Sequence, residues 1–510
     1  MKTEIKRWGI NGEGVAYIDK KATFVPGAII DETVEINIVE EKETYNIAKL
    51  VEVIEPSKYR RHPFCPIWKQ CGGCSLMSVN YKGQCKMKES ILKDSLSKYA
   101  HYEGRILPIV KNPEPLAYRN SCKLPFGRID GRIVTGMYER NTTNFVALDR
   151  CYTHSKTIEK VRKEIEDIVN QFDLFLYNKE KGDGLKTLVL KEYNQKVQVV
   201  FITGEDTLPE EMIQKVADIE EVCSLWQSVR SKYEESHELF GDKMIHLALE
   251  EKVEVQLNNY SASLLPRSFF QLNTKQAIQM YEEVARLTPQ SHVIVEAYSG
   301  IGAISLFVHD KAEKVIGIES ILDAVENAED NAQRNGIENV DFIHGDAAKE
   351  LSYVKRVEKV DCLIVDPPRT GLDEEMKNAI LDSEIETMIY VSCNPSTLAK
   401  DLDVLQQKYR ILSVQPFDMF SQTGLVETVV LLKKMDPSKQ RKPRRDSRSF
   451  EKRDDRRAPR KDGESKFDKD RKNFDRKDKK FDGERKRFDR KDKKFDGEKK
   501  RFEHKRFKKD

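Results

Sequence analysis

The sequence contains no apolar stretch close to the ~20 residues that a membrane-spanning helix requires. Its first ten residues, MKTEIKRWGI, are charged and lack the apolar core of a secretory signal. These absences favour a cytoplasmic protein that is neither exported nor anchored in a membrane. In that compartment the nine cysteines are expected to be free, catalytic or metal-bound rather than paired in disulfides.

The formal net charge of +3 hides a strong asymmetry along the 510 residues. Residues 437–510 contain 34 Lys/Arg and 18 Asp/Glu, a net charge of +16, whereas residues 1–436 carry a net charge of −13. A basic segment attached to an acidic body is typical of proteins that bind nucleic acid through a cationic arm.

This tail, residues 436–510, almost lacks aliphatic residues and repeats phenylalanine every seven positions, at Phe467, Phe474, Phe481, Phe488, Phe495 and Phe502. Each repeat has one apolar position and lacks the second one that a coiled-coil seam needs. We therefore expect the tail to be disordered. It is either a solubilising extension or, as we favour, an RNA-binding arm whose phenylalanines stack on bases.

Residues 1–56 show short alternating apolar and polar runs between glycine, aspartate and lysine turns, a pattern typical of a small all-β module. The length fits a five-stranded OB-like barrel, a frequent oligonucleotide-binding fold. Gly12, Gly14, the VPGA turn at residues 25–28 and the exit EPSKYR resemble a TRAM domain, an RNA-binding module. The Pro-Gly-Glu turn of that module is replaced by Ile-Asp-Glu at residues 30–32.

Residues 57–265 read as a mixed α/β domain, with a helix expected over residues 81–100 and a hairpin over residues 185–204. At its start the run CPIWKQCGGC places Cys65, Cys71 and Cys74 close together, and no fourth ligand follows nearby. Structural zinc sites and iron–sulfur clusters usually take four protein ligands. The local sequence therefore leaves this site incomplete.

From residue 266 to residue 435 strands and helices alternate, which predicts a doubly wound α/β domain. Five apolar strands are expected within the segments HVIVEAYSG, KVIGIES, VDFIHGDA, VDCLIVDPP and TMIYVSC. In such a sheet ligands bind beyond the carboxyl ends of the strands. The residues that end these five strands are therefore the candidates for binding and chemistry.

A nucleotide-like ligand is indicated by four of these positions. Gly300 and Gly302 let the backbone approach a small molecule, Glu319 is placed for ribose hydroxyls and Asp346 for an adenine amine. NAD would fit the same set, but the turn lacks the third glycine of the dinucleotide fingerprint. The Asp-Pro-Pro loop at Asp366 places a rigid polar group at the ligand's reactive end. We therefore favour S-adenosylmethionine.

Cys393 follows the fifth strand at the same edge. A free cysteine is often only a small buried residue. A thiolate here would, however, solve a chemical problem, because carbon 5 of uracil is too weak a nucleophile for a methylsulfonium. Addition of a thiolate at carbon 6 gives an enolate and activates carbon 5. Glu427, at the start of the last strand, can then remove the carbon 5 proton.

The motifs SFFQLN, AYSGIGAISL, IGIES, DPPRTG, YVSCNPSTLAKD and VETVVLL follow one another as in uracil-5 RNA methyltransferases, and residues 1–435 resemble the branch that acts on 23S ribosomal RNA. The resemblance implies a class I, Rossmann-like methyltransferase domain with Cys393 as nucleophile and Glu427 as proton acceptor. It places four residues in the cofactor and target pocket: Gln271, Tyr298, Glu319 and Asp366. Two positions depart from the family pattern, namely Glu296, where aspartate is usual, and Ala303, where a polar residue is common.

The same resemblance supplies a distant fourth ligand, Cys151, in the run LDRCYTHS. It implies that Cys65, Cys71, Cys74 and Cys151 hold a 4Fe–4S cluster with a structural role, although four thiolates would also permit zinc. His62 and His154, which lie near these ligands in the sequence, are expected to be bystanders.

The expected partner is RNA, with 23S ribosomal RNA favoured, and we expect a monomer. Two alternatives stay open. The first is a transfer-RNA uracil-5 methyltransferase, which would perform the same chemistry on another RNA. The second is a non-catalytic RNA-binding protein on the same fold, although such a protein would need neither Cys393 nor Glu427.

Overall fold

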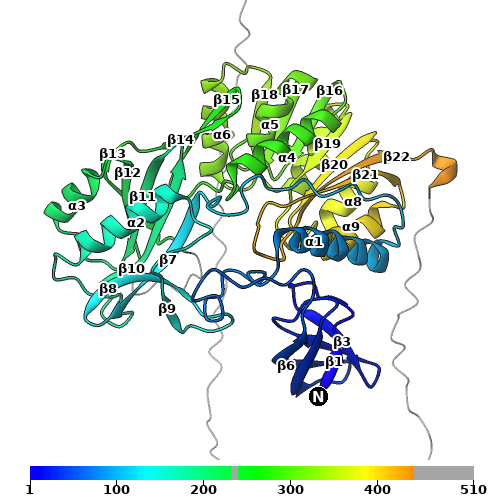
Figure 1. The fold of residues 1–510 in the computed structure, drawn as a ribbon. Coiled ribbons are helices and arrows are strands. Elements are labelled where there is room, and N and C mark those ends of the chain that lie inside the picture. Colours follow the sequence, from blue (N-terminus) through cyan, green and yellow to red (C-terminus); the bar gives the residue numbers. More distant parts are fainter. Residues whose placement is uncertain (231–238, 441–510) are drawn as a thin grey trace, which may run out of the picture. The chain divides into compact units, whose positions relative to one another are not determined.

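The computed structural model describes residues 1–230 and 239–440 (Figure 1). The sequence beyond residue 440, with its phenylalanine repeat, therefore lies outside the described residues, and so do the predictions made for it.

The N-terminal sheet contains six strands: β1 (Lys2–Glu4), β2 (Arg7–Trp8), β3 (Gly14–Ile18), β4 (Lys21–Val25), β5 (Thr33–Glu41) and β6 (Tyr45–Glu55). Their order is β1-β5-β6-β4-β3-β2, so β1 and β2 lie at opposite edges. These two short strands follow one another in the chain around the buried Ile5. The sheet is therefore closed by one interrupted N-terminal strand, which explains six strands where five were expected.

The substituted turn at residues 30–32 is anchored by a buried carboxylate. Asp31 has a φ of +65°, and Glu32 accepts hydrogen bonds from the backbone amides of Ile29 at 2.8 Å and Ser57 at 3.3 Å. Arg60 pairs with the same carboxylate, with its Nη2 2.7 Å from Glu32 Oε2. The ion pair therefore anchors the substituted turn and joins the barrel to the segment that follows it.

The middle of the chain holds a second sheet of seven strands, ordered β13-β12-β11-β10-β7-β8-β9. Its strands are β7 (Ser121–Ile129), β8 (Arg132–Tyr138), β9 (Phe145–Ala147), β10 (Leu185–Tyr193), β11 (Lys196–Thr203), β12 (Val222–Val229) and β13 (Lys243–Leu249). Helices α2 (Lys156–Val169) and α3 (Glu210–Ala217) pack on this sheet through a shared apolar core (Figure 1). This is the mixed α/β arrangement that the sequence predicted.

Two elements from residues 57–265 pack on the C-terminal sheet, which is described below, and not on the middle one. Helix α1 (Tyr81–Ser95) continues as a π-helical turn to Ala100 and contributes Leu92 to the core of the C-terminal sheet. The hairpin of β14 (Val253–Leu257) and β15 (Tyr260–Leu264) belongs to the core on the other face of that sheet. The sequence had assigned both to the middle domain, because helical and strand patterns do not reveal packing partners.

The C-terminal sheet has the order β18-β17-β16-β19-β20-β22-β21 (Figure 1). Its strands are β16 (Ser291–Ala297), β17 (Ala312–Glu319), β18 (Val340–His344), β19 (Cys362–Val365), β20 (Thr387–Ser392), β21 (Tyr409–Phe417) and β22 (Glu427–Lys434). The first five in that order are parallel, and β22 runs antiparallel to both of its neighbours. The start of β22 therefore meets the carboxyl end of β20, where Ser392 pairs with Thr428.

Besides α1, helices from the C-terminal part of the described residues cover the two faces of this sheet. One face packs against α7 (Ala347–Val357), α8 (Glu374–Leu381) and α9 (Pro395–Leu405), and the other against α4 (Thr274–Leu287), α5 (Ala303–Val308) and α6 (Leu322–Arg334). The strand order reverses between β16 and β19, which is the point where ligands bind in open α/β sheets.

Candidate active site

The turn after β16 has a backbone shaped for close approach. Tyr298, Gly300 and Gly302 all have positive φ, at +66°, +54° and +77°. For Tyr298 this conformation is strained, a feature that often accompanies functional sites. A Cβ on Gly300 would meet no heavy atom within 4 Å, whereas one on Gly302 would lie 2.6 Å from the ring of Phe342. Gly300 therefore faces open space, and Gly302 permits tight packing behind the turn.

Glu319 ends β17 and ties it to this turn. Its carboxylate accepts hydrogen bonds from the amides of Gly300 at 3.0 Å, Ser320 at 2.7 Å and Ile321 at 2.9 Å. Beside it the apolar side chains of Ile321 and Leu322 are 61% and 49% exposed, which gives a flat ring a surface to pack on. The sequence reasoning missed these two residues, although two aliphatic residues directly after a strand-ending acid were a visible signal.

Other acids at this edge lie in different surroundings. Asp346 is exposed and caps α7, where its side chain accepts from the amide of Lys349 at 3.1 Å. Glu296 is buried and accepts a hydrogen bond from Ser305. Burial and the nearby Asp366 raise the pKa of Glu296 to about 8, and burial raises the pKa of Asp366 to about 7. The floor of the site therefore holds carboxyl groups that are partly protonated at neutral pH.

Cys393 stands between β20 and α9, with its thiol half-buried. The next residue, Asn394, caps α9 by accepting from the amide of Ser396 at 3.1 Å and donates to the carbonyl of Arg369 at 3.0 Å. These bonds fix the thiol relative to the Asp-Pro-Pro-Arg loop. Burial and the charges of Glu427 and Asp366 raise the pKa of Cys393 to about 12, against the lowering effect of Arg369.

Glu427 begins β22 and is 3% exposed. Burial and Asp366 raise its pKa to about 8, whereas Arg369 and Lys88 lower it. Glu427 and Cys393 influence each other electrostatically, and the strand pairing puts them at neighbouring strand ends. The structure thus brings together the two residues that the sequence named as nucleophile and base. It adds Arg369 as a cation acting on both.

The segment with the SFFQLN motif is held by a buried lysine and exposes the ring of Phe269. Lys191 is buried and donates to the carbonyls of Pro266 and Ser268, both at 2.7 Å. Phe269 is nevertheless 73% exposed, and Gln271 is buried at 8% exposure. Among the described residues the structure gives the Gln271 side-chain amide no hydrogen-bond partner. The sequence prediction included Gln271 and missed Phe269. Two adjacent phenylalanines in one motif could have indicated it, because only one of the two rings is buried.

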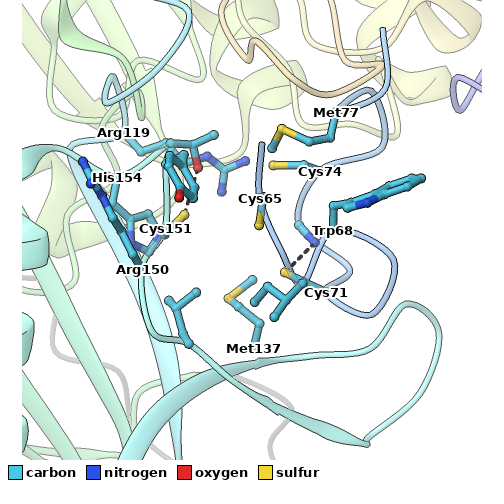
Figure 2. Close-up of a pocket in the computed structure, with 15 residues that line it drawn as sticks. Cys65, Trp68, Cys71, Cys74, Met77, Arg119, Met137, Arg150, Cys151 and His154 are labelled. Atoms are coloured by element: carbon cyan, nitrogen blue, oxygen red, sulfur yellow. Dashed lines mark hydrogen bonds between the residues drawn. The ribbon is translucent and has the colours of Figure 1, made fainter. Parts of the chain in front are cut away.

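The four cysteines predicted as cluster ligands line one pocket, together with Trp68, Arg119 and His154 (Figure 2). Cys65, Cys71 and Cys74 come from one segment, and Figure 2 shows Cys151 across the pocket from them. Within residues 1–230 and 239–440, however, no three His, Cys, Asp or Glu side chains are arranged to hold a metal ion. The thiols are therefore gathered without forming a finished coordination sphere.

The thiols in this pocket differ in acidity. Burial raises the pKa of Cys74 to about 12. At Cys151 burial acts in the same direction, but interaction with His154 lowers the pKa to about 6. His154 is itself buried, with Nδ1 2.8 Å from a carboxylate oxygen of Glu159. The same carboxylate accepts from the Cys151 backbone amide at 3.1 Å, so His154 and Cys151 share Glu159 as a partner, and the role of His154 toward a metal stays a prediction.

The other four cysteines do not line this pocket. Cys362 lies within β19. Cys85, Cys122 and Cys362 are buried and Cys223 is half-buried. Among the described residues no helix is long and apolar enough to cross a membrane.

The sheet order, the glycine turn after its first strand and the acid after the second together define a methyltransferase of the S-adenosylmethionine-dependent class. Comparison with known proteins is more specific. The model of the tRNA (uracil-5-)-methyltransferase family matches residues 80–435, and that of the TRAM domain matches residues 4–51. The chain belongs to the tRNA (uracil-5-)-methyltransferase family, and it is an S-adenosylmethionine-dependent RNA methyltransferase.

Relatives and solved structures agree with this assignment. The chain is 37% identical over 445 residues to an uncharacterized RNA methyltransferase of Listeria monocytogenes, covering 85% of this chain and 96% of the relative. It is 36% identical over 442 residues to one from Halalkalibacterium halodurans, covering 84% and 95%. The crystal structure of Pyrococcus abyssi tRNA (uracil-54, C5)-methyltransferase with S-adenosyl-L-homocysteine superposes with a TM-score of 0.70 at 26% identity, covering 85% of this chain and 100% of that one.

Proposed function

We propose that this enzyme methylates carbon 5 of a uridine in 23S ribosomal RNA through a covalent adduct between Cys393 and the base. The observation that carries the proposal is the meeting of the Cys393 thiol and the Glu427 carboxyl at neighbouring strand ends, under the shared influence of Arg369 and Asp366. A methyltransferase that acts on an already nucleophilic atom needs neither a thiol nor a buried carboxyl placed in this way.

Cys393 acts first. Its thiolate adds to carbon 6 of the uracil, and the electrons of the 5,6 double bond move to give an enolate with a nucleophilic carbon 5. Carbon 5 then takes the methyl group, whose bond to the donor sulfur breaks. Because burial favours the protonated Cys393 thiol, the thiol must first lose its proton to solvent, and the Arg369 guanidinium assists that loss by lowering the pKa.

Glu427 completes the reaction. Its carboxylate accepts the carbon 5 proton, the double bond reforms, and the bond between carbon 6 and sulfur breaks, which releases the Cys393 thiolate. A base for this step should be shielded from water and should have a pKa near the working pH, so that a carboxylate fraction is present and can accept the proton. Glu427 meets both conditions, because it is 3% exposed and its pKa is about 8.

S-adenosylmethionine supplies the methyl group. The open space at Gly300, the carboxylate of Glu319 and the exposed aliphatic surface beside it fit the amino-acid, ribose and adenine parts of this molecule. We assign Tyr298, Gly302, Asp346 and Asp366 to the same pocket. Gln271, whose buried amide is free among the described residues, and Phe269, whose ring is exposed, are assigned to the target base and its neighbours.

We extend the proposal to a 4Fe–4S cluster held by Cys65, Cys71, Cys74 and Cys151. Four thiols lining one pocket fit the donor set of such a cluster, and zinc is the alternative. Methyl transfer has no redox step for the cluster to perform. We therefore give it a structural role, in which it fastens residues 65–74 to the strand region that carries Cys151.

The choice of ribosomal RNA rests on the TRAM domain together with the cysteine pocket. Transfer RNA is the second candidate, because the similar Pyrococcus abyssi enzyme is a tRNA (uracil-54, C5)-methyltransferase. A basic and aromatic surface beside the cysteine pocket suits either RNA: Arg61 stacks on Phe64 at 4.8 Å, and Arg150 on Tyr152 at 5.1 Å. We further propose that the protein acts as a monomer in the cytoplasm.

The test is a strain that lacks the gene, complemented with the wild-type protein or with Cys393→Ala. Mass mapping of 5-methyluridine in 23S ribosomal RNA and in transfer RNA should show one ribosomal position that is modified only with the wild-type protein. Loss of 5-methyluridine from transfer RNA instead would move the target to transfer RNA. An unchanged content in both RNAs would overturn the proposed function.

A further inference from the structure

The segment that leads into Glu427 is polar and yet buried. Residues 418–426, here called the base loop, join β21 to β22. Asp418 and Ser421 are fully buried, Gln422 is 1% exposed, and Gln422 has a φ of +69°. A buried polar loop of this kind is stable only when its groups find partners. Those partners therefore decide where Glu427 stands.

Two of the partners come from one face of helix α1. Gln84 and Lys88 are four residues apart, which places them one turn above each other, and both are fully buried. Lys88 pairs with the carboxylate of Asp418 and donates to the carbonyl of Phe420 at 2.9 Å. Its positive charge is thus enclosed between α1 and the base loop.

Gln84 forms a reciprocal pair with Gln422. Its side-chain nitrogen donates to Gln422 Oε1 at 2.9 Å, and its side-chain oxygen accepts from the Gln422 backbone amide at 2.9 Å. The same Gln422 oxygen accepts from Arg61 Nη2 at 2.6 Å, and its carbonyl accepts from the amide of Leu76 at 3.0 Å. These bonds hold the backbone of Gln422 in its unusual conformation.

The ion pair of Lys88 and Asp418 is fully buried, which is uncommon for charged side chains. Two charges lose hydration on burial, and well-packed apolar residues often stabilise a fold as well or better. The pair is therefore more readily explained by what it orients than by stability. The residue that it orients is Glu427, which follows the base loop directly.

Lys88 also acts on Glu427 by its charge. The titratable groups that influence Glu427 are Asp366, which raises its pKa, and the two cations Arg369 and Lys88, which lower it. Glu427 in turn raises the pKa of the Cys393 thiol and of the buried Tyr281 hydroxyl. Lys88 is the cation of this group that stands on α1, away from the Asp-Pro-Pro-Arg loop.

We propose that Gln84 and Lys88 are positioning residues for the catalytic base, which hold the base loop in place, and that the charge of Lys88 favours the carboxylate form of Glu427. This inference rests on the proposed function, because it concerns the step in which Glu427 removes the carbon 5 proton. It assigns a role in that step to a helix outside the family's strand-end motifs.

The test measures how fast the covalent protein–RNA adduct resolves in a single turnover at several pH values. With Lys88→Met, resolution at pH 7 should slow, and the pH at which it reaches half its maximum should rise, because a cation that lowers the pKa of Glu427 is lost. Raising the pH should recover the rate. Gln84→Leu removes no charge, so it should slow resolution at every pH without moving the profile.

The matched control is Lys86→Met, on the same helix. Lys86 is exposed and pairs with Glu89, so this variant should behave as the wild type does. Lys88→Arg keeps the charge and should keep the profile. Because Lys88→Met leaves Asp418 unpaired, the double variant Lys88→Met with Asp418→Asn protects the test against unfolding. S-adenosyl-L-homocysteine binding verifies that each variant is folded.

A folded double variant with the wild-type rate and pH profile would overturn the inference. A slower rate with an unmoved profile in Lys88→Met and in the double variant would leave the positioning role and overturn the role assigned to the charge of Lys88. Failure of the proposed function is a separate result: the wild-type protein itself would then form no adduct and no 5-methyluridine.

Discussion

Removal of the carbon 5 proton should become faster as the pH rises from 7 to 9, because only the carboxylate form of Glu427 can accept a proton. Its pKa is about 8, raised by burial and by Asp366. About one tenth of the molecules would carry the carboxylate at pH 7 and about nine tenths at pH 9. The rate of adduct resolution should therefore rise about tenfold over this range.

The assay must separate this step from formation of the adduct. RNA and S-adenosylmethionine are incubated with the enzyme at pH 6, where about one hundredth of Glu427 is carboxylate and resolution is slow, and the adduct that has formed is measured on a denaturing gel. The pH is then raised in a second mixing step, and the protein–RNA band on a denaturing gel is followed in time. The Cys393 thiol is consumed in the adduct, so its own pKa of about 12 does not affect the measured rate.

Replacement of the base provides the refutation. Glu427→Gln removes the proton acceptor, and general bases typically contribute about 10²–10⁴-fold to a rate. The adduct of this variant should persist, and its slow decay should no longer depend on pH between 7 and 9. If Glu427→Gln resolves the adduct at the wild-type rate, or with the same rise over this range, another group is the base. Cys393→Ala, which should form no adduct while still binding S-adenosylmethionine, is the negative control.

Three further predictions concern other parts of the chain. Anaerobically purified protein should be brown and contain iron, and Cys151→Ser should remove the colour as fully as Cys71→Ser does; one equivalent of zinc without iron would contradict this. Truncation after Gln440 should weaken RNA binding and flatten its salt dependence, since the +16 charge of residues 437–510 lies almost wholly beyond that point. Single-turnover methylation at saturating RNA should stay unchanged. An unchanged salt dependence would mean that the tail serves only solubility. Gly302→Ala should lower the free energy of unfolding by about 1–3 kcal/mol more than Gly336→Ala. Both glycines have positive φ, but only at Gly302 would the added Cβ lie 2.6 Å from the ring of Phe342. Equal losses of unfolding free energy would contradict the packing argument.

The sequence was sufficient to place the candidate residues at one edge of the sheet, because each of those signals is local. Gly300 follows a strand and Glu319 ends the next, and parallel strands bring their carboxyl ends to one edge whatever the rest of the fold does. Cys393 and Glu427 lie 34 positions apart in the sequence and were paired by chemistry, because a nucleophile without a base would leave the adduct unresolved. The strand register then placed them side by side.

The surroundings of the base could not be predicted in this way. Lys88 and Asp418 are 330 residues apart, and in the sequence Lys88 is one of many lysines on a helix of mixed character. Its burial arises only because α1 packs on the C-terminal sheet. The surroundings of Cys151 were missed for a related reason: its backbone amide and the ring of His154 both bond to Glu159, which lies one turn into α2.

The raised pKa values also predict how the cofactor and the base are coupled. Glu296, Asp366 and Glu427 have pKa values of about 8, 7 and 8, so the free enzyme holds bound protons at pH 7 that an exposed carboxyl would have lost. S-adenosylmethionine carries a sulfonium cation, which favours the carboxylate form of nearby acids, whereas S-adenosyl-L-homocysteine is a neutral thioether. Binding of the first should therefore release protons, and its affinity should rise with pH between 6 and 8.

Isothermal titration calorimetry in buffers of different ionisation enthalpy measures this release directly. We expect proton release with S-adenosylmethionine near pH 7 and a smaller value with S-adenosyl-L-homocysteine, and Glu296→Gln should reduce the difference between the two ligands. Equal proton release for both ligands would mean that the carboxyl groups do not sense the methyl donor's charge. If the difference is found, the sulfonium favours the carboxylate forms of the site's acids before the methyl group is transferred, and that effect is lost once the neutral thioether has formed.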